Sequence, residues 1–302
     1  MWPPEVTDLL PRTNFPAAGT QLSCAVSGGA DSLALMALAV AAGCAVTALH
    51  VDHGLRPEGP DEARLVAAAA ARLGARFESV RIVVDPGPNL EARARAARFS
   101  CLPPQVATGH TMDDQAETVL SNLLRGAGVD GLAGMRAGHR HPLLGIRRAE
   151  AAGACGALGL RWVEDPSNED PRFLRNRIRH ELLPLCCALA RRDVVPVLAR
   201  QACLLADEAE ELDALASSAL PDPSDARGLA AAPVAVARRA VRGWLREARS
   251  CVEGDDQIDR HPPTLAEVDR VLDVARGLAV ATQLEGALEV RRSKGRLHLD
   301  RT

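Results

Sequence analysis

Short apolar runs alternate with stretches of helical spacing along the first half of the chain. The runs 22–26 and 45–51 are typical of buried strands, and apolar residues recur at helical spacing over 32–42. Strands that alternate with helices in this way predict a parallel, doubly wound α/β sheet. The pattern predicts strands over 22–26, 45–51, 77–84 and 105–108, and helices over 5–10, 32–42, 61–73, 89–100 and 149–158.

Past Pro184 the strand-like runs disappear and only helical spacing remains, until a short apolar alternation near the end. The sequence therefore predicts an α/β domain over residues 1–186, followed by a small, mainly helical domain over 187–302 that ends in a β-hairpin. The elements expected in the second domain are helices over 194–215, 233–248 and 265–276 and hairpin strands over 287–290 and 297–300.

The composition is typical of soluble globular proteins. The chain has 302 residues, of which 47% are hydrophobic, and a formal net charge of -3. No apolar run approaches the ~20 residues of a membrane span, and the N-terminus lacks the basic and apolar regions of a signal peptide. We therefore expect a cytoplasmic protein without a membrane segment. The 8 cysteines are scattered and form no Cys-x-x-Cys pair, which predicts reduced thiols.

A glycine-rich turn separates the first predicted strand from the helix that follows. This glycine loop, Ser27-Gly28-Gly29-Ala30-Asp31-Ser32, allows a ligand to approach the backbone, and the helix after it points free N–H groups at the same place. Phosphate is the ligand that such a turn favours. The only lysine is Lys294, and no glycine follows Gly29 before Gly43, which excludes a Walker loop and the dinucleotide fingerprint. The alternative is a plain strand-to-helix corner, which two hydroxyls and a carboxylate around the turn disfavour.

A second polar stretch follows the predicted strand 105–108. Thr111 and Asp114 have the spacing of a capping box, which places the acids in the first turn of a helix. His110, Asp113 and Glu117 then share one face of that helix. Capping alone would explain Asp114. It does not require three further polar groups, so this face is a candidate site.

An arginine-rich segment follows the acidic turn 164–170. On a helix, Arg172, Arg175 and Arg179 fall on one side. Such a stripe is either a solvated face or a contact for a nucleic-acid backbone, and the sequence leaves both interpretations open.

Several motifs occur in one order along the chain. They are the blocks 27–32, 51–56, 108–118, 122–126, 131–135, 142–144, 165–168 and 175–179. Through them the chain resembles the bacterial tRNA(Ile)-lysidine synthetases, which are N-type ATP pyrophosphatases of the PP-loop superfamily. The glycine loop by itself indicates only the superfamily, whereas the blocks together indicate the family.

The resemblance implies a ligase that uses ATP to adenylate the wobble cytidine of the isoleucine tRNA with a CAU anticodon. Free L-lysine then displaces AMP and forms lysidine. The implied ATP contacts are Val26, Ser27, Gly28, Gly29, Ala30, Asp31, Ser32, Val51, His53 and Gly109, with Mg²⁺ held by Asp31. The implied catalytic residues are Asp31, His110, Asp113, Asp114 and Glu117, the last four making an acidic pocket for the lysine ammonium or for a second metal. The implied tRNA contacts are Arg172, Arg175 and Arg179.

Other interpretations are weaker. A tRNA thiolase built on the same loop is disfavoured because none of the 8 cysteines has the spacing of the cysteine pair that such enzymes use. A metal-dependent phosphohydrolase gives the glycine loop no role. It is suggested by His50, Asp52 and His53 and by His110, Asp113 and Asp114. A tRNA-binding module without catalysis is opposed only weakly by the net charge. His141 stands where the family usually has arginine, with Arg140 one place earlier. Homodimer formation and discrimination against the methionine tRNA stay open.

Overall fold

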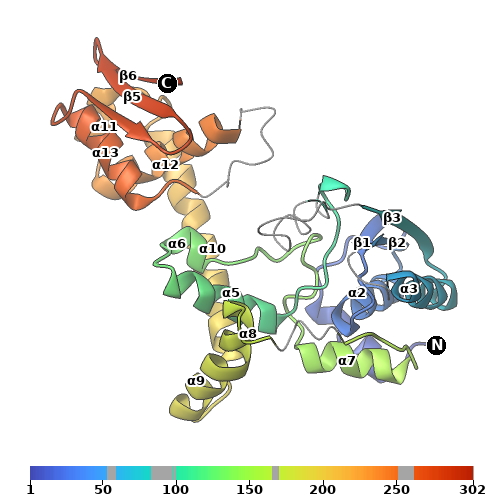
Figure 1. Ribbon diagram of the computed structural model, residues 1–302. Coiled ribbons are helices and arrows are strands. Elements are labelled where there is room, and N and C mark those ends of the chain that lie inside the picture. The colour runs from blue at the N-terminus through green and yellow to red at the C-terminus, as the bar shows by residue number, and fades with distance from the viewer. Residues whose placement is uncertain (53–58, 83–96, 98–99, 165–169, 251–261, 302) are drawn as a thin grey trace. The chain divides into compact units, whose positions relative to one another are not determined.

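The computed structural model describes the chain except for residues 53–58, 83–96, 98–99, 165–169, 251–261 and 302. The described residues form two compact units, Met1–Ala206 and Asp207–Thr302 (Figure 1). The division lies within the long helix α10 (Val195–Ala219), later in the chain than the boundary predicted after residue 186.

The first unit is built around a parallel sheet of three strands, β1 (Gln21–Ala25), β2 (Ala45–Asp52) and β3 (Arg76–Arg81), in the order β1-β2-β3. Parallel strands need long crossover connections, which contain α2 (Ala30–Ala41) and α3 (Gly59–Leu73) (Figure 1). The predicted α/β class with a parallel sheet is therefore confirmed.

Helix α2 lies at the centre of the core of this unit. Its residues 33–39 are all fully buried, so the helix is apolar on every side, as expected for a helix enclosed by other elements. It packs between the sheet and α7 (Arg148–Ala157), whose Ala151 and Ala154 belong to the same buried cluster. Burial of each leucine side chain contributes roughly 1.5–3 kcal/mol. This packing determines where α2 begins, and therefore where the glycine loop lies.

For three predicted elements of this unit, the structure does not show the element as predicted. The run 105–108 forms no strand, only a single parallel bridge in which Ala107 pairs with Cys24. The N-terminal helix is divided into α1 (Pro4–Thr7) and a 3₁₀ turn (Leu10–Arg12), because Pro11 cannot donate the backbone hydrogen bond of a continuous helix. The helix predicted over 89–100 lies mostly outside the described residues.

Helices complete the first unit. Ala116 and Leu120 are buried together with Ile178, Leu183 and Val195, which come from segments much later in the chain. This contact holds the start of α10 on the first unit and explains why that unit extends beyond residue 186. The helical elements of this part of the unit are α5 (Met112–Leu124), α6 (Val129–Leu132), α8 (Leu174–Arg177), a π-helical turn (Ile178–Leu182) and α9 (Leu183–Ala190).

The second unit combines helices with a small antiparallel sheet in the order β4-β5-β6. β5 and β6 form the predicted hairpin, whose turn places Lys294 and Gly295 at positive φ, as two-residue turns favour. β4 is a further strand, so the sheet has three strands rather than the predicted two. The elements after α10 are α11 (Ala226–Ala231), α12 (Val234–Ser250), α13 (Leu265–Arg276), β4 (Ala281–Leu284), β5 (Leu288–Ser293) and β6 (Arg296–Arg301).

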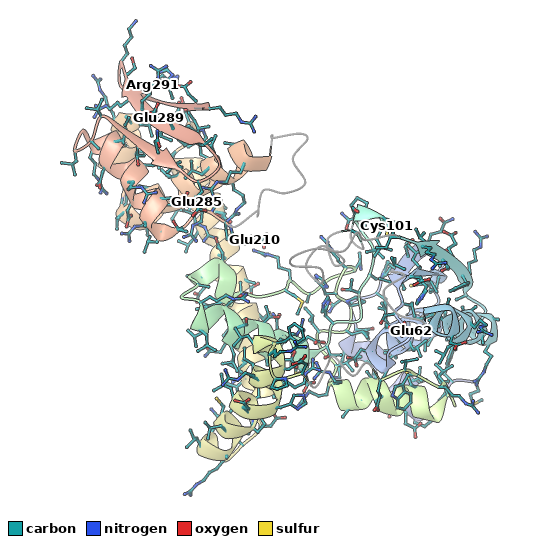
Figure 2. The ribbon with its side chains drawn as sticks, in the orientation of Figure 1. Glu62, Cys101, Glu210, Glu285, Glu289 and Arg291 are labelled. Atoms are coloured by element: carbon teal, nitrogen blue, oxygen red, sulfur yellow. The ribbon has the colours of Figure 1, made fainter. Side chains whose placement is uncertain are left out.

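Buried and exposed side chains alternate along β5, as expected for a strand with one covered face. Leu288 and Val290 are buried in the core that includes Leu272 of α13. Glu289 and Arg291, which alternate with them along the strand, are polar and more exposed (Figure 2). None of the helices that the structure describes combines the length and the apolar composition of a membrane span.

Candidate functional site

The glycine loop joins β1 to α2 and is held by its own hydroxyl groups. Gly28 has a φ of 91°, a left-handed conformation that residues with a Cβ avoid. The Ser32 hydroxyl accepts a hydrogen bond from the N–H of Ser27 at 3.2 Å and donates one to the carbonyl of Gly29 at 2.9 Å. No side chain caps α2, because its N-cap is Gly29. The first N–H groups of α2 are therefore donors suited to phosphate.

Asp31 lies in the first turn of α2. Its Oδ2 is 3.4 Å from Nε of Arg148, whereas its buried Oδ1 has no hydrogen-bond partner among the described residues. Burial raises the pKa of Asp31 to about 6, and the negative charge of Asp114 acts in the same direction. A buried carboxylate oxygen without a partner fits a cation such as Mg²⁺, which prefers oxygen ligands.

Gly109 brings the second polar motif against the glycine loop. A Cβ placed on Gly109 would lie 2.6 Å from the carbonyl oxygen of Asp31 and 2.8 Å from its carbonyl carbon, closer than real Cβ atoms approach. Only glycine therefore lets the backbone before α5 run along the start of α2. The structure brings together two motifs that are far apart in the sequence.

Helix α5 begins with the predicted capping box between Thr111 and Asp114, in which the N–H of Thr111 donates to Oδ2 of Asp114 at 2.8 Å. Asp114 does more than cap, because its Oδ1 accepts hydrogen bonds from Arg148 at 2.9 Å and from Arg175 at 2.7 Å. Burial opposes ionisation of this carboxyl, but Arg148 and Arg175 lower the pKa of Asp114 to about 2. Asp114 is therefore ionised at neutral pH.

Glu117 lies one turn further along α5, with 0% of its side chain exposed. Its Oε1 accepts hydrogen bonds from Arg148 at 3.0 Å and Arg179 at 2.7 Å, and its Oε2 accepts one from Arg175 at 2.8 Å. The predicted acidic pocket is thus neutralised by arginines in this structure. We call the whole group the charge cluster: Asp31, Asp114, Glu117, Arg148, Arg175 and Arg179.

Asp113 has a different partner from Asp114 and Glu117. Its oxygens accept hydrogen bonds from Nη2 and Nε of Arg147, both at 3.0 Å, and from the N–H of Arg148 at 2.8 Å. Burial opposes ionisation, but the bonds from Arg147 and from the Arg148 N–H lower the pKa of Asp113. Asp113 thus binds the N-terminus of α7, where a carboxylate is favoured.

His110 precedes α5 and meets the loop before α7. Oγ1 of Thr108 is 2.7 Å from Nδ1 of His110 and 2.8 Å from Nδ1 of His141. Burial lowers the pKa of His141, and the charge of Arg140 lowers it further. His141, where the resemblance leads one to expect arginine, therefore joins the site as a hydrogen-bonding ring rather than as a cation.

The arginines of segment 172–179 do not form the predicted stripe. Arg172 lies before α8 and pairs with Asp170, with 83% of its side chain exposed. Arg175 and Arg179 instead turn toward α5 and join the charge cluster. The reason is local: α8 is a short helix followed by a π-helical turn, so the regular spacing behind the prediction does not hold.

Sequence reasoning missed Arg148. It is the first residue of α7, and nothing local distinguishes it from its neighbour Arg147. Its place follows from the packing of α7 on α2, where the buried Sγ of Cys155 lies 3.3 Å from the carbonyl of Ala30. The one feature of the sequence that could have indicated Arg148 as a site residue is its position shortly after the block 142–144.

The remaining predicted ATP contacts lie at strand ends. Val26 is 2% exposed and its carbonyl is 2.9 Å from Nδ1 of His50, so its side chain belongs to the core. Val51 is partly exposed near the end of β2. His53 lies outside the described residues, and its contact with ATP stays a prediction. Within the described ranges, no group of three or more His, Cys, Asp and Glu side chains is arranged to hold a metal.

This chain matches a PP-loop family profile, and three known proteins that are similar to it share one name. The family profile of the PP-loop domain matches residues 6–186. The tRNA(Ile)-lysidine synthase of Nocardia farcinica is 42% identical over 307 residues, which cover 95% of this chain and 94% of that protein. Its namesake from Rhodococcus erythropolis is 44% identical over 248 residues, covering 78% and 76%. That of Mycobacterium leprae is 41% identical over 303 residues, covering 92% and 91%.

Among solved structures, the U34-tRNA thiolase NcsA from Methanococcus maripaludis, with its [4Fe-4S] cluster, is similar at a TM-score of 0.49. The two sequences are 17% identical, and the match covers 67% of this chain and 78% of that one.

Proposed function

The chain belongs to the tRNA(Ile)-lysidine synthase family of PP-loop proteins, and we propose that it forms lysidine in an isoleucine tRNA with a CAU anticodon. ATP would adenylate the C2 carbonyl oxygen of the wobble cytidine and release pyrophosphate. The amine of free L-lysine would then attack C2, so that a carbon–nitrogen bond forms and the C2–O bond to AMP breaks. The observation that carries this proposal is the close approach of Gly109 to Asp31, which sets a phosphate loop against an acidic helix.

The glycine loop and α2 supply the ATP site in this proposal. The N–H groups at the start of α2 and the hydroxyl of Ser27 would donate to phosphate oxygens and stabilise the departing pyrophosphate. The Ser32 hydroxyl would have to give up its bond to the Gly29 carbonyl before it could do the same. Asp31 would hold Mg²⁺, which its buried, unpartnered Oδ1 fits. When bound, the ion supplies the positive charge that this loop, which contains no lysine, does not provide.

Asp114 and Glu117 are the proposed partners of the lysine ammonium, because charge-assisted hydrogen bonds to carboxylates select a cation. His110, held through Thr108, would accept the proton that the amine loses before it attacks. Asp113 acts indirectly in this scheme, since its bonds to Arg147 and to the N–H of Arg148 hold the start of α7 in place.

The tRNA contacts are proposed on charge and exposure. Arg172 exposes 83% of its side chain and is suited to a phosphate contact. Arg175 and Arg179 could contact phosphate only after leaving the charge cluster. We further propose that residues 187–302 serve as a tRNA-binding domain, and that the enzyme works in the cytoplasm, where tRNA is modified.

A single assay tests the function. Purified protein is incubated with ATP, Mg²⁺, labelled L-lysine and a transcript of the isoleucine tRNA with a CAU anticodon. We expect label in RNA, with one AMP and one pyrophosphate released for each lysine incorporated. The matched methionine tRNA, which shares the anticodon, should take up far less label. Absence of label from the isoleucine tRNA would contradict the proposal.

A further inference from the structure

Arg148 lies between the two halves of the site. Its Nε is 3.4 Å from Asp31 in the glycine loop. Its Nη2 is 2.9 Å from Asp114 and 3.0 Å from Glu117 on α5. One guanidinium therefore contacts the proposed Mg²⁺ ligand and both proposed partners of the lysine ammonium.

The positive and negative charges of the charge cluster are equal in number when no ligand is bound. Its three carboxylates face three guanidinium groups, counted among the residues that the structure describes. Asp114 and Glu117 expose 9% and 0% of their side chains, so water screens them weakly. A lysine ammonium that entered this cluster would add a positive charge without a counter-ion, beside three arginines. Such a buried, uncompensated charge is unfavourable.

ATP changes this balance because its phosphates bring negative charge to the glycine loop, beside Asp31. Guanidinium groups bind phosphate strongly and in defined geometry. Arg148 already reaches Asp31, so a movement of its side chain alone can exchange carboxylate oxygens for phosphate oxygens. The two carboxylates on α5 then lose one of their counter-ions.

We propose that Arg148 is a positioning residue that couples the two substrate sites: it occupies Asp114 and Glu117 until ATP binds, so that lysine binding depends on ATP. This inference rests on the proposed function and gives the two small substrates an order of binding. It also distinguishes Arg148, which forms the ion pair with Asp31, from Arg175 and Arg179, which pair with Asp114 or Glu117. Arg179 acts on Asp31 through its charge.

Calorimetric titration of L-lysine into the full chain tests this coupling, with and without Mg²⁺ and α,β-methylene-ATP, whose α–β bond is not cleaved. We expect the wild-type protein to bind L-lysine about 10-fold more tightly with the analogue, which corresponds to about 1.4 kcal/mol. Arg148→Gln removes the charge that occupies the carboxylates. This variant should bind L-lysine without the analogue about as tightly as the wild type does with it.

Arg12→Gln is the matched control. Arg12 also pairs with an acid of α7, Glu150, at 2.6 Å, but lies outside the charge cluster. We expect this variant to keep the dependence on the analogue. Arg148→Lys keeps the charge but cannot bridge three carboxylates, so its affinity for L-lysine should depend less on the analogue than that of the wild type. This variant replaces Arg148→Gln if the latter fails to fold.

Equal affinity of the wild type for L-lysine with and without the analogue overturns the inference. So does an unchanged affinity ratio in a folded Arg148 variant. The labelled-lysine assay separates this failure from that of the proposed function: incorporation into tRNA together with equal affinities rejects only the coupling. A protein that incorporates no lysine rejects the proposed function, whereas the coupling is decided by the ratio of the two affinities.

Discussion

His110 and His141 meet edge to face, with ring centroids 5.2 Å apart and planes inclined at 72°. Oγ1 of Thr108 lies within hydrogen-bond distance of Nδ1 of both rings. A hydroxyl carries one proton, so it donates to at most one of these nitrogens, and at least one imidazole must donate its own Nδ1 proton to Thr108. That ring, when neutral, keeps a lone pair on Nε2 and is able to accept a proton.

Thr108→Val should therefore change catalysis as well as stability. Valine keeps the shape but leaves ring nitrogens without their partner, which should destabilise the fold by about 1–3 kcal/mol. Loss of the fixed tautomer should also shift the pH profile of kcat for lysine incorporation. Thr282→Val is the control, because the hydroxyl of this residue on β4 is 3.5 Å from a backbone carbonyl, a weak contact in the part of the chain that the structure describes. An unchanged pH profile in Thr108→Val would assign the threonine a structural role only.

Asp31→Asn should make the metal-free protein more stable above pH 6 while abolishing activity. The pKa of Asp31 is raised to about 6, above its unfolded value, so the native state binds more protons between about pH 4 and 6. Stability from this group is therefore present below that window and declines as the pH rises through it. Asparagine does not titrate, and we expect it to gain roughly 1–2 kcal/mol over the wild type at pH 8.

Urea unfolding in EDTA at pH 5 and pH 8 measures this effect. The control is Asp8→Asn, which changes an exposed acid after α1 and against which the pH dependence of the Asp31→Asn difference is compared. A stability difference between Asp31→Asn and the wild type that does not grow with pH would refute the argument.

Asp114→Asn should destabilise the protein with the opposite dependence on pH. The pKa of Asp114 is lowered to about 2 by Arg148 and Arg175 against the effect of burial. Its stabilisation is present above the unfolded pKa and is lost as the pH falls from about 4 toward 2. Removing the buried charge leaves two guanidinium groups under-neutralised, which should cost about 3–5 kcal/mol at pH 7.

Asp269→Asn is the matched control for Asp114→Asn. Asp269 pairs with Arg238 in the second unit at 2.8 Å, with both side chains about two-fifths exposed. Such an exposed pair contributes about 0–1 kcal/mol. The free energy of unfolding of both variants is measured with urea at pH 7. A similar decrease in the two would show that Asp114 stabilises the protein no more than an exposed ion pair does.

Gly109→Ala should weaken ATP binding. Its Cβ would lie 2.6 Å from the carbonyl oxygen of Asp31, so the backbone before α5 must move away from the glycine loop. We expect a loss of about 10-fold or more in affinity for α,β-methylene-ATP, equal to about 1.4 kcal/mol. Gly153→Ala is the control, since a Cβ there meets open space within α7 and should stabilise the helix by roughly 0.5–1 kcal/mol. Unchanged binding of the analogue by Gly109→Ala would contradict the close approach.

Much of the fold could be predicted because its signals are local. The apolar runs of β1 and β2, the capping box of Thr111 and Asp114, and the Lys294–Gly295 turn each depend on residues within a few positions of one another. β4 could not be predicted in the same way. It pairs with β5 through backbone atoms, and its residues 281–284 carry no alternation strong enough to signal a strand.

The candidate site was predicted only in part. The glycine loop, Gly109 and the acids of α5 are visible as motifs, and the structure brings them together. Their partners are not visible as motifs. Arg148, Arg175 and Arg179 reach the same carboxylates from separate segments, and 36 basic residues, nearly all arginine, offer no local sign of which will do so.

By itself, the sequence determined most of the elements, the phosphate loop and the type of acid on α5, because spacing along the chain governs helices, turns and caps. Only the tertiary structure decided that these acids are paired with arginines, that Asp113 binds the start of α7, and that Arg148 joins Asp31 to α5. The physical reason is that ion pairs depend on distance in space. The packing of α7 on α2 and of α8 on α5 sets those distances.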